Sequence, residues 1–332
     1  MTVLEWAQHL VGPALRRSVT RLPPSVRRVA DYHFAWPDTA AGRGAGGGKA
    51  IRPALALLFA QALGGDAKNA VPAAVVVELV HNFSLLHDDV MDRDTLRRHR
   101  PAAWTVFGTS QAILAGDALL TLAWQVLSEQ KVCPSISAMA QLSSALMELV
   151  EGQSADVAFE NRVDVGLDEC IAMAANKSGS LIGVACMLGA QAGGASTEQA
   201  QYAQQYGHNL GLAFQLVDDL LGVWGDPEVT GKPVFADLAI RKKSLPVVAA
   251  LTSATSAGEE LAALYQRPDQ LDEADLRRAA LLVEQAGGRH WCESQARKHL
   301  QAAGTCLDIL GPDARTRARL DALGVMVVER DR

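Results

Sequence analysis

The segment that decides the fold spans residues 71–92 and reads VPAAVVVELVHNFSLLHDDVMD. Pro72 suits the first turn of a helix, and the apolar residues recur near a period of 3.6, which predicts one helix over Val71–Met91. That helix ends in three aspartates, Asp88, Asp89 and Asp92. On an α-helix, positions i, i+1 and i+4 fall within about 100° of arc. The sequence therefore predicts an apolar helix with three carboxylates on one face at its C-terminal end.

These carboxylates have the chemistry of a magnesium site. Carboxylate oxygens are hard ligands that suit Mg²⁺ better than zinc or copper, and Mg²⁺ usually completes its shell with water and substrate phosphates. Like charges at i, i+4 cost about 0.2–0.5 kcal/mol per pair, which invites a counter-charge. A lone pattern of this kind is more readily explained as the solvated acidic end of a helix.

A second segment repeats the pattern further along the chain. Residues 215–222 read QLVDDLLG and place Asp218 and Asp219 in an otherwise apolar helix predicted over Gln199–Trp224. Unpaired carboxylates are unfavourable in such a helix. If the two aspartate-bearing helices face each other, they form one metal-lined mouth on an apolar cavity.

Basic residues are grouped near both aspartate segments. Lys49 and Arg52, spaced i, i+3 after a glycine-rich stretch, can reach one anion. His81 lies two turns before Asp88 on the same helix face, since each turn takes 3.6 residues. The other candidates are Arg97, Arg98, Lys177, Lys232, Arg241, Lys242 and Lys243. Together they suggest magnesium and at least two phosphate sites, although any one of them alone is better explained as surface charge.

The composition favours an all-α protein with a large core. Of the 332 residues, 49% are hydrophobic and only 5% are aromatic, and alanine, leucine and valine dominate in helical spacing. Further helices are predicted over Ala112–Glu129 and Ser137–Ala158, and helical structure over Glu259–Arg332 with breaks at Gly287–Gly288 and Gly311–Pro312. No linker separates domains, so a single helical domain over residues 1–332 is expected. The net charge of −6 excludes a global basic field for nucleic acid.

Cysteine usage and the chain's N-terminal residues indicate a cytoplasmic protein. Five cysteines are scattered without Cys-x-x-Cys spacing (Cys133, Cys170, Cys186, Cys292 and Cys306), which argues against a disulfide framework or a structural zinc site. No signal peptide is evident. The uncharged window Ser178–Thr197 is long enough to span a membrane, but its small and polar residues favour a buried helix. We therefore expect a soluble protein with no membrane span.

From about Gly46 to Pro246, the chain resembles the trans-isoprenyl diphosphate synthases of the polyprenyl synthetase family. GKAIRP (48–53) is similar to the family's GKxxRP motif, His81–Asp92 to its first aspartate-rich motif, and RRHRP (97–101) to its RRGxP motif. Gly152-Gln153 with Asp156, Lys177-Ser178, FQLVDD (214–219), TGKP (230–233) and KKSLP (242–246) match further blocks in the family's order. This resemblance implies a single large helical bundle of the isoprenoid synthase type with a central apolar cavity.

The resemblance also implies roles for individual residues. Asp88 and Asp92 would bind Mg²⁺, with three ions around a bound diphosphate, and Asp218 would complete the metal cluster with Asp89 and Asp219 in support. The allylic diphosphate would be held by Arg97, Lys177, Lys232 and Lys242. The diphosphate of isopentenyl diphosphate would be held by Lys49, Arg52, His81 and Arg98. Ser178 and Gln215 would lie near the reacting carbons, and a homodimer is expected.

The implied reaction is a condensation of isopentenyl diphosphate with an allylic diphosphate. Metal ions and basic side chains stabilise the charge that grows on the departing pyrophosphate, which makes ionisation to an allylic cation feasible. The double bond of the second substrate attacks that cation, and loss of a proton restores an alkene. An apolar cavity keeps water away from the cation.

Two positions depart from the family pattern, and two others bear on product length. Gly222 stands where the second motif usually has its third aspartate, and His99 replaces a usual glycine. Phe83 and Ser84, five and four residues before Asp88, resemble the residues of short-chain synthases that make a twenty-carbon product. Geranylgeranyl diphosphate is therefore the expected product, with farnesyl diphosphate next. Phe83 is equally well explained as an ordinary core residue.

Two other functions fit parts of the sequence. A class I terpene cyclase on the same fold would ionise a preformed diphosphate, but it has no use for Lys49, Arg52, His81 and Arg98. A non-catalytic subunit that pairs with an active synthase gains slight support from Gly222, whereas the intact set Asp88, Asp89 and Asp92 weighs against it.

Overall fold

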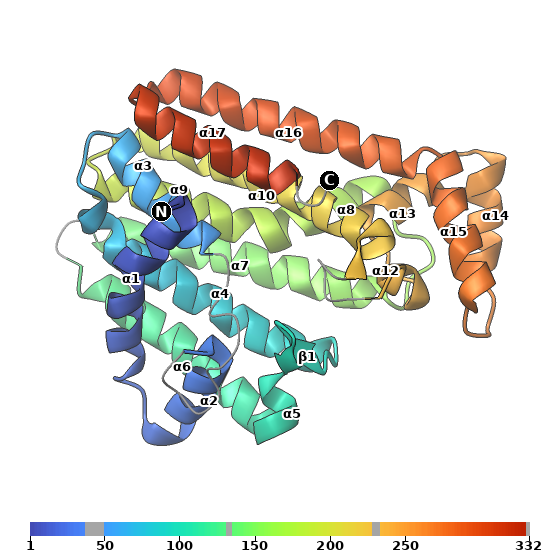
Figure 1. The fold of residues 1–332 in the computed structure, drawn as a ribbon, viewed down its shortest axis with the longest axis horizontal. Helices are drawn as coiled ribbons and strands as arrows, with labels where there is room; N and C mark the ends of the chain where they lie inside the picture. The colour runs from blue at the N-terminus through green and yellow to red at the C-terminus, as the bar shows by residue number, and fades with distance from the viewer. Residues whose placement is uncertain (37–49, 131–134, 228–232, 330–332) are drawn as a thin grey trace. The chain divides into compact units, whose positions relative to one another are not determined.

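The computed structural model describes residues 1–36, 50–130, 135–227 and 233–329 (Figure 1). In these residues the regular structure is helical apart from two two-residue strands, β1 (Leu96–Arg97) and β2 (Arg100–Pro101), which pair as an antiparallel hairpin. The all-α prediction is thus confirmed. Lys49, Cys133 and Lys232 lie outside the described residues.

Contacts between residues divide the chain into two compact units. The first unit comprises residues 1–144, 184–204 and 307–323, and the second comprises residues 145–183, 205–306 and 324–332. Five of the described helices contribute residues to both: α7 (Ser135–Phe159), α9 (Ser180–Ala192), α10 (Thr197–Trp224), α16 (Gly288–Leu310) and α17 (Ala314–Val328). The single domain over residues 1–332 stays a prediction.

In the first unit, the central helix is α4 (Val71–Met91), whose bounds agree with those predicted from the sequence. It packs against α1 (Val3–Val19), α3 (Ile51–Ala62) and α6 (Thr109–Ser128) (Figure 1). Residues on every side of α4 are buried, as expected for a helix that is apolar all round. The remaining elements of this unit are α2 (Pro24–Phe34), η1 (Ala67–Ala70) and α5 (Ala103–Phe107).

Two apolar clusters pack the described part of the second unit. One joins α8 (Leu167–Ala174), α10 and α16 through residues such as Cys170, Leu216 and Cys292. The other joins α12 (Ala236–Ala239), α13 (Leu245–Leu251), α14 (Ser256–Tyr265) and α15 (Glu273–Gln285). Between α8 and α9, residues Ala175–Gly179 form a π-helical turn, η2. Lys177 thus lies inside one continuous helical run, Leu167–Ala192.

The helix ends in the C-terminal third lie where the sequence places them. Gly287, between α15 and α16, and Gly311, between α16 and α17, have φ values of +85° and +59°. Glycine is the residue that adopts this left-handed conformation without steric cost, so both helices end there. The helices predicted over Ala112–Glu129, Ser137–Ala158 and Gln199–Trp224 correspond to α6, α7 and α10 within a few residues.

Three helical runs in the described residues are long and apolar enough to cross a membrane by length and composition. They cover Ala67–Met91, Thr109–Ser128 and Leu167–Ala192, and their most apolar windows are 67%, 44% and 72% buried within the protein. The apolar character of the first and third runs is therefore explained mainly by their burial in the core. This agrees with the buried helix predicted within Ser178–Thr197.

The cysteines give a prediction about thiol reactivity. Cys170, Cys186, Cys292 and Cys306 are buried, and burial raises the pKa of each thiol above its usual value. Because the thiolate is the reactive form, these groups should be inert in the folded protein. In a Cys133→Ser variant, we expect a colorimetric thiol reagent to label all four cysteines in denaturant and essentially none under native conditions. Rapid labelling of any of them in the native state would contradict the packing described.

Candidate active site

The first aspartate segment closes α4. Asp88 is half-buried in its last turn, and Asp92 is the exposed C-cap residue, whose N–H donates to the Asp88 carbonyl at 2.8 Å. The two residues are one helical turn apart, so their side chains lie on the same side of the helix end. This placement leaves two carboxylates at the surface of the first unit.

Asp89 is buried, and its carboxylate is paired with an arginine. Its Oδ1 accepts hydrogen bonds from Nε of Arg97, at 2.8 Å, and from Nη2 of Arg97. Asp89 is 1% exposed, and Arg97 lies in β1 of the hairpin that follows α4. Burial raises the pKa of Asp89, and the hydrogen bonds from Arg97 partly offset that effect. The pair fixes the guanidinium of Arg97 next to the aspartate cluster.

The hairpin turn requires an unusual backbone conformation. Arg98 and His99, the two residues between β1 and β2, have φ values of +53° and +59°. Two-residue hairpins favour such turns and usually place asparagine, aspartate or glycine in them. This explains physically why glycine is usual at position 99 of the resembled motif, and His99 adopts the same conformation at some steric cost.

A group of enclosed polar residues lies beneath Arg98 in the first unit. Glu78 and Asn82 are buried on α4, and Nδ2 of Asn82 donates to the carbonyl and to Oε1 of Glu78. Burial and the positive charges of Arg98 and Arg97 lower the pKa of His33 to about 3. For His81, burial and then Arg52 and Arg98 lower the pKa well below its usual value. Both imidazoles are therefore neutral near pH 7.

Several buried polar atoms in this group have no hydrogen-bond partner among the residues that the structure describes. They include Nη1 of Arg98 and Oδ2 of Asp89. Buried polar groups are almost always paired, with protein, water or ligand. An unpartnered guanidinium N–H favours an anion at this place.

Phe83 is held from one side by His87. The two rings meet edge to face with centroids 4.8 Å apart. Nε2 of His87 lies 3.0 Å from the carbonyl oxygen of Ile113 and 3.6 Å from Oδ1 of Asp117, both on α6. A Cβ atom at Gly116 would lie 2.3 Å from His87 Nε2, so only glycine leaves room for the imidazole. α6 thus fixes His87, which in turn fixes the Phe83 ring.

In the second unit, the π turn presents Lys177 and Ser178. Nζ of Lys177 donates to Oδ2 of Asp156 at 2.5 Å, and both side chains are largely buried. A Cβ atom at Gly152 would lie 2.4 Å from the Lys177 backbone nitrogen, which explains the glycine at that close contact with α7. π turns inside α-helices occur often at functional sites.

A chain of hydrogen bonds joins Ser178 to Asp219. Oγ of Ser178 donates to Oε1 of Gln215 at 2.5 Å, and Nε2 of Gln215 donates to Oδ1 of Asp219 at 2.7 Å. The other oxygen of Asp219 accepts the N–H of Leu245 at the start of α13. Burial raises the pKa of Asp219 to about 7, against the opposing effect of Lys242 and these hydrogen bonds. Asp218, by contrast, is exposed.

Lys242 is the cation at the centre of the second unit's carboxylates. Burial by itself would lower the pKa of its ammonium, but the negative charges of Asp237, Asp219, Asp156 and Asp218 outweigh that effect and raise it. Lys242 is therefore fully charged. Asp237 is buried on α12, and its carbonyl accepts the Lys242 N–H at 2.9 Å.

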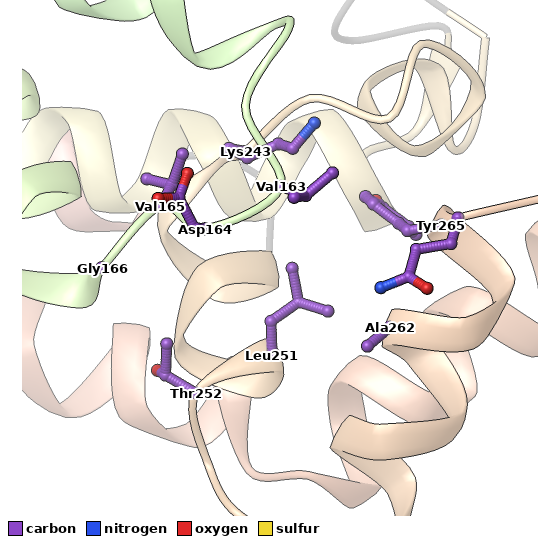
Figure 2. A pocket seen from close by; sticks show the side chains of 10 residues that line it. Val163, Asp164, Val165, Gly166, Lys243, Leu251, Thr252, Ala262 and Tyr265 are labelled. Atoms are coloured by element: carbon purple, nitrogen blue, oxygen red, sulfur yellow. The ribbon is translucent and has the colours of Figure 1, made fainter.

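The neighbouring Lys243 has a different environment. Figure 2 shows it on the wall of a pocket of about 270 Å³ together with Val163, Leu251 and Tyr265. Burial and the charge of Arg241 lower the pKa of Lys243. Lys243 is one of the basic candidates in the sequence, and no other described residue predicted to bind substrate or metal lines this pocket. Adjacent lysines thus belong to two distinct environments.

The donor set fits magnesium. Within the described part of the chain, no three histidine, cysteine, aspartate or glutamate side chains already converge to hold a metal ion. Mg²⁺ does not need such a cage, because it is usually bound through one or two carboxylates, several waters and substrate phosphates. Asp88, Asp92 and Asp218 supply carboxylates at accessible positions, whereas Asp89 and Asp219 are engaged in supporting hydrogen bonds.

The predicted site residues therefore fall into two groups that the structure assembles locally. One contains the aspartates of α4 with His81, Arg97 and Arg98, and the other contains Lys177, Ser178, Gln215, Asp218, Asp219 and Lys242. Arg52 lies in the first turn of α3. Sequence reasoning did not single out His33, Glu78, Asn82 or Asp237 as site residues. No periodic pattern or motif spacing in the sequence marks these four positions.

Comparisons with known proteins agree with this chemistry. The family model for polyprenyl synthetase matches residues 39–283. The chain is 45% identical to the (2E,6E)-farnesyl diphosphate synthase of Mycobacterium tuberculosis, over 99% of this chain and 93% of that protein. It is 44% identical to that organism's geranylgeranyl diphosphate synthase, with the same coverage. The crystal structure of a polyprenyl synthetase from Streptomyces coelicolor A3(2) superimposes with a TM-score of 0.92, at 46% identity and 98% coverage of both chains.

The fold and the two groups of residues define an all-α enzyme of the isoprenyl synthase type, a trans-prenyltransferase. The chain belongs to the polyprenyl synthetase family. Its recognition from the sequence motifs is confirmed, as is the predicted fold class.

Proposed function

We propose that this enzyme condenses isopentenyl diphosphate with an allylic diphosphate to make geranylgeranyl diphosphate, with farnesyl diphosphate as the next most favoured product. The observation that carries the proposal is the end of α4, where Asp88 and Asp92 stand one turn apart beside an Arg97 that Asp89 fixes in place. Carboxylates for a metal and a fixed guanidinium for phosphate are the two elements that diphosphate ionisation requires.

In this proposal, Asp88, Asp92 and Asp218 hold Mg²⁺, three ions in all when a diphosphate is bound. The bound ions would supply positive charge that offsets the charge growing on the departing pyrophosphate. Arg97, Lys177 and Lys242 bind the allylic diphosphate, and Lys232 does so from outside the described residues.

The second diphosphate has its own set of groups in the proposal. Arg52, His81 and Arg98 bind isopentenyl diphosphate, together with Lys49, which also lies outside the described residues. A neutral His81 can still donate one hydrogen bond to a phosphate oxygen. The unpartnered Nη1 of Arg98 is available for the same purpose.

Ser178 and Gln215 have a supporting role near the reacting carbons. Their hydrogen bonds to each other and to Asp219 hold both side chains in one orientation. In this proposal, the allylic cation lies near a hydroxyl and an amide, neither of which is a strong nucleophile. Apolar surroundings keep water away from that cation.

Phe83 is proposed as the residue that limits product length, with Ser84 beside it. The ring is buried and is fixed through His87, so it cannot swing aside to admit a longer chain. Phe83→Ala should therefore shift the main product to longer prenyl chains, as sized by chromatography after dephosphorylation. Phe107→Ala serves as the matched control, because Phe107 packs edge-on against Tyr32 in the same unit and should leave product length unchanged. An unaltered product distribution for a folded Phe83→Ala enzyme would refute this role.

The product assay tests the proposed function directly. Purified protein is incubated with isopentenyl diphosphate and dimethylallyl, geranyl or farnesyl diphosphate, with and without Mg²⁺. A magnesium-dependent twenty-carbon diphosphate from these starters supports the proposal. A hydrocarbon or alcohol made from a preformed diphosphate alone would indicate a terpene cyclase, and no product in any tube would indicate a non-catalytic subunit.

We also propose that the enzyme is a cytoplasmic homodimer without a membrane span. Large apolar side chains are exposed on α6 (Ile113 and Leu114) and on α7 (Met147 and Val150), and exposed apolar surface often marks a subunit interface. Sedimentation of the purified protein measures the oligomeric state.

A further inference from the structure

Tyr32, near the C-terminal end of α2, is joined to the second strand of the hairpin through both its side chain and its backbone. Its phenolic hydroxyl donates to the carbonyl of Pro101 at 2.9 Å. In return, Nη1 of Arg100 donates to the carbonyl of Tyr32 at 3.3 Å, and the guanidinium carbon of Arg100 lies 4.5 Å from the centre of the Tyr32 ring. Arg100 and Pro101 are the two residues of β2. One residue of α2 therefore holds the whole of that strand.

The Tyr32 ring is fixed in turn by α5. It meets the ring of Phe107 edge to face with centroids 5.2 Å apart, and the guanidinium carbon of Arg28, from α2, lies 5.3 Å from the centre of the Phe107 ring. Trp104, also on α5, donates from Nε1 to the carbonyl of Asp94 at 2.7 Å, just before the hairpin. The helices α2 and α5 thus hold both the segment that enters the hairpin and the strand that leaves it.

The turn between the two strands needs such support. Its residues, Arg98 and His99, have the left-handed φ values given above, a conformation that is sterically unfavourable for arginine and histidine alike. Each strand has only two residues, and a ribbon this short is at best marginally stable by itself. A strained backbone conformation persists only where the surrounding structure holds it. The turn therefore depends on contacts from outside the hairpin, and Tyr32 provides them.

The two arginines of the hairpin differ in how their side chains are held. Arg97 is anchored by its hydrogen bonds to the buried Asp89. Nη1 of Arg98 is buried and has no hydrogen-bond partner among the residues that the structure describes. The position of the Arg98 guanidinium therefore depends mainly on the backbone of the turn. A loosened turn should affect Arg98 more than Arg97.

We propose that Tyr32 is a positioning residue, which holds β2 so that the strained turn presents Arg98 to the diphosphate of isopentenyl diphosphate. This inference rests on the proposed function and adds a requirement for the site of that substrate. In this chain, the contacts of Tyr32 compensate for the glycine that is usual at position 99. The competing explanation is that Tyr32 only packs α2 against α5, which would affect stability without selecting one substrate site.

Steady-state kinetics of a Tyr32→Phe variant test the proposal. This substitution removes the hydroxyl that binds Pro101 and keeps the ring that packs on Phe107 and Arg100. The KM for isopentenyl diphosphate should rise about threefold to tenfold, as expected for loss of one hydrogen bond, while kcat and the KM for the allylic diphosphate stay close to their wild-type values. Tyr202→Phe, which removes a hydroxyl from α10 in the same unit, is the matched control and should behave like the wild type.

A second substitution separates positioning from packing. Glycine adopts a positive φ without steric cost, so His99→Gly should stabilise the turn by itself. The double variant Tyr32→Phe, His99→Gly should therefore recover the wild-type KM for isopentenyl diphosphate. A packing defect between α2 and α5 would not be repaired by a change in the hairpin turn.

Hydrogen exchange of the free protein gives a readout that needs no substrate. Amides of residues 94–102 should exchange about threefold to tenfold faster in Tyr32→Phe than in the wild type, and the double variant should reverse this change. An unchanged KM for isopentenyl diphosphate, an equal rise in both KM values, or no recovery in the double variant overturns the inference. If the wild type does not condense isopentenyl diphosphate, the proposed function fails, and unchanged hydrogen exchange in Tyr32→Phe would show separately that Tyr32 does not hold the turn.

Discussion

Replacement of Asp88 by alanine should reduce turnover about a thousandfold or more while leaving the fold intact. Asp88 lies in the last turn of α4, half-buried and one turn from Asp92, so it contributes a ligand to the proposed metal site rather than to the core. Metal ions contribute several kcal/mol to the stabilisation of a departing phosphate, and each 1.36 kcal/mol is about tenfold in rate.

The stability of the same variant provides an independent readout. Removing one of three clustered carboxylates relieves repulsion of about 0.2–0.5 kcal/mol per i, i+4 pair but also removes an attraction to Arg97, so Asp88→Ala should melt close to the wild type in the absence of metal. Asp117→Ala is the control, because this carboxylate is exposed on α6 of the same unit and should leave turnover close to that of the wild type. Near-normal activity of Asp88→Ala would contradict the metal assignment.

The second large effect is expected at Lys242, with its neighbour as the control. Lys242 lies among four aspartates of the second unit, and we propose that its charge holds the allylic diphosphate. Loss of one positioned donor to a developing charge costs about 10²–10³ in kcat, and Lys242→Ala should fall in that range. Lys243→Ala should retain wild-type turnover, because Lys243 lines the separate pocket in Figure 2.

Steady-state kinetics with both substrates measure this pair of variants. Equal losses in Lys242→Ala and Lys243→Ala would show that the two lysines act through general charge, which contradicts their separate environments. A Lys242→Arg variant keeps the charge but carries a larger guanidinium, so it should be more active than Lys242→Ala and less active than the wild type. That result would support a role for the charge itself.

Much of this fold could be predicted from local sequence. α4 has the predicted bounds because Pro72 marks its first turn, its apolar residues recur with the helical period, and its aspartates mark its end. Gly287 and Gly311 end helices by the same kind of local rule. The motifs identified the family because their residues remain in order along the chain, whatever distances separate them in space.

The features that could not be predicted all depend on contacts between distant segments. No local pattern predicts that Asp89 accepts hydrogen bonds from Arg97, because Asp88 and Asp89 are both aspartates in one turn of the helix. The π turn at Lys177 has no periodic signal of its own. Gly222 looks like a lost ligand in the sequence, and only the approach of α12 in the folded unit places the Asp237 carboxylate beside it.

The most direct test of condensation is the stoichiometry of pyrophosphate release. Purified protein is mixed with geranyl diphosphate and Mg²⁺, and pyrophosphate is followed continuously before and after addition of labelled isopentenyl diphosphate. We predict no release before the addition, and then one pyrophosphate for each isopentenyl unit incorporated into a longer prenyl diphosphate. Release from the allylic diphosphate alone, without incorporation of label, would contradict the assignment as a condensing prenyltransferase.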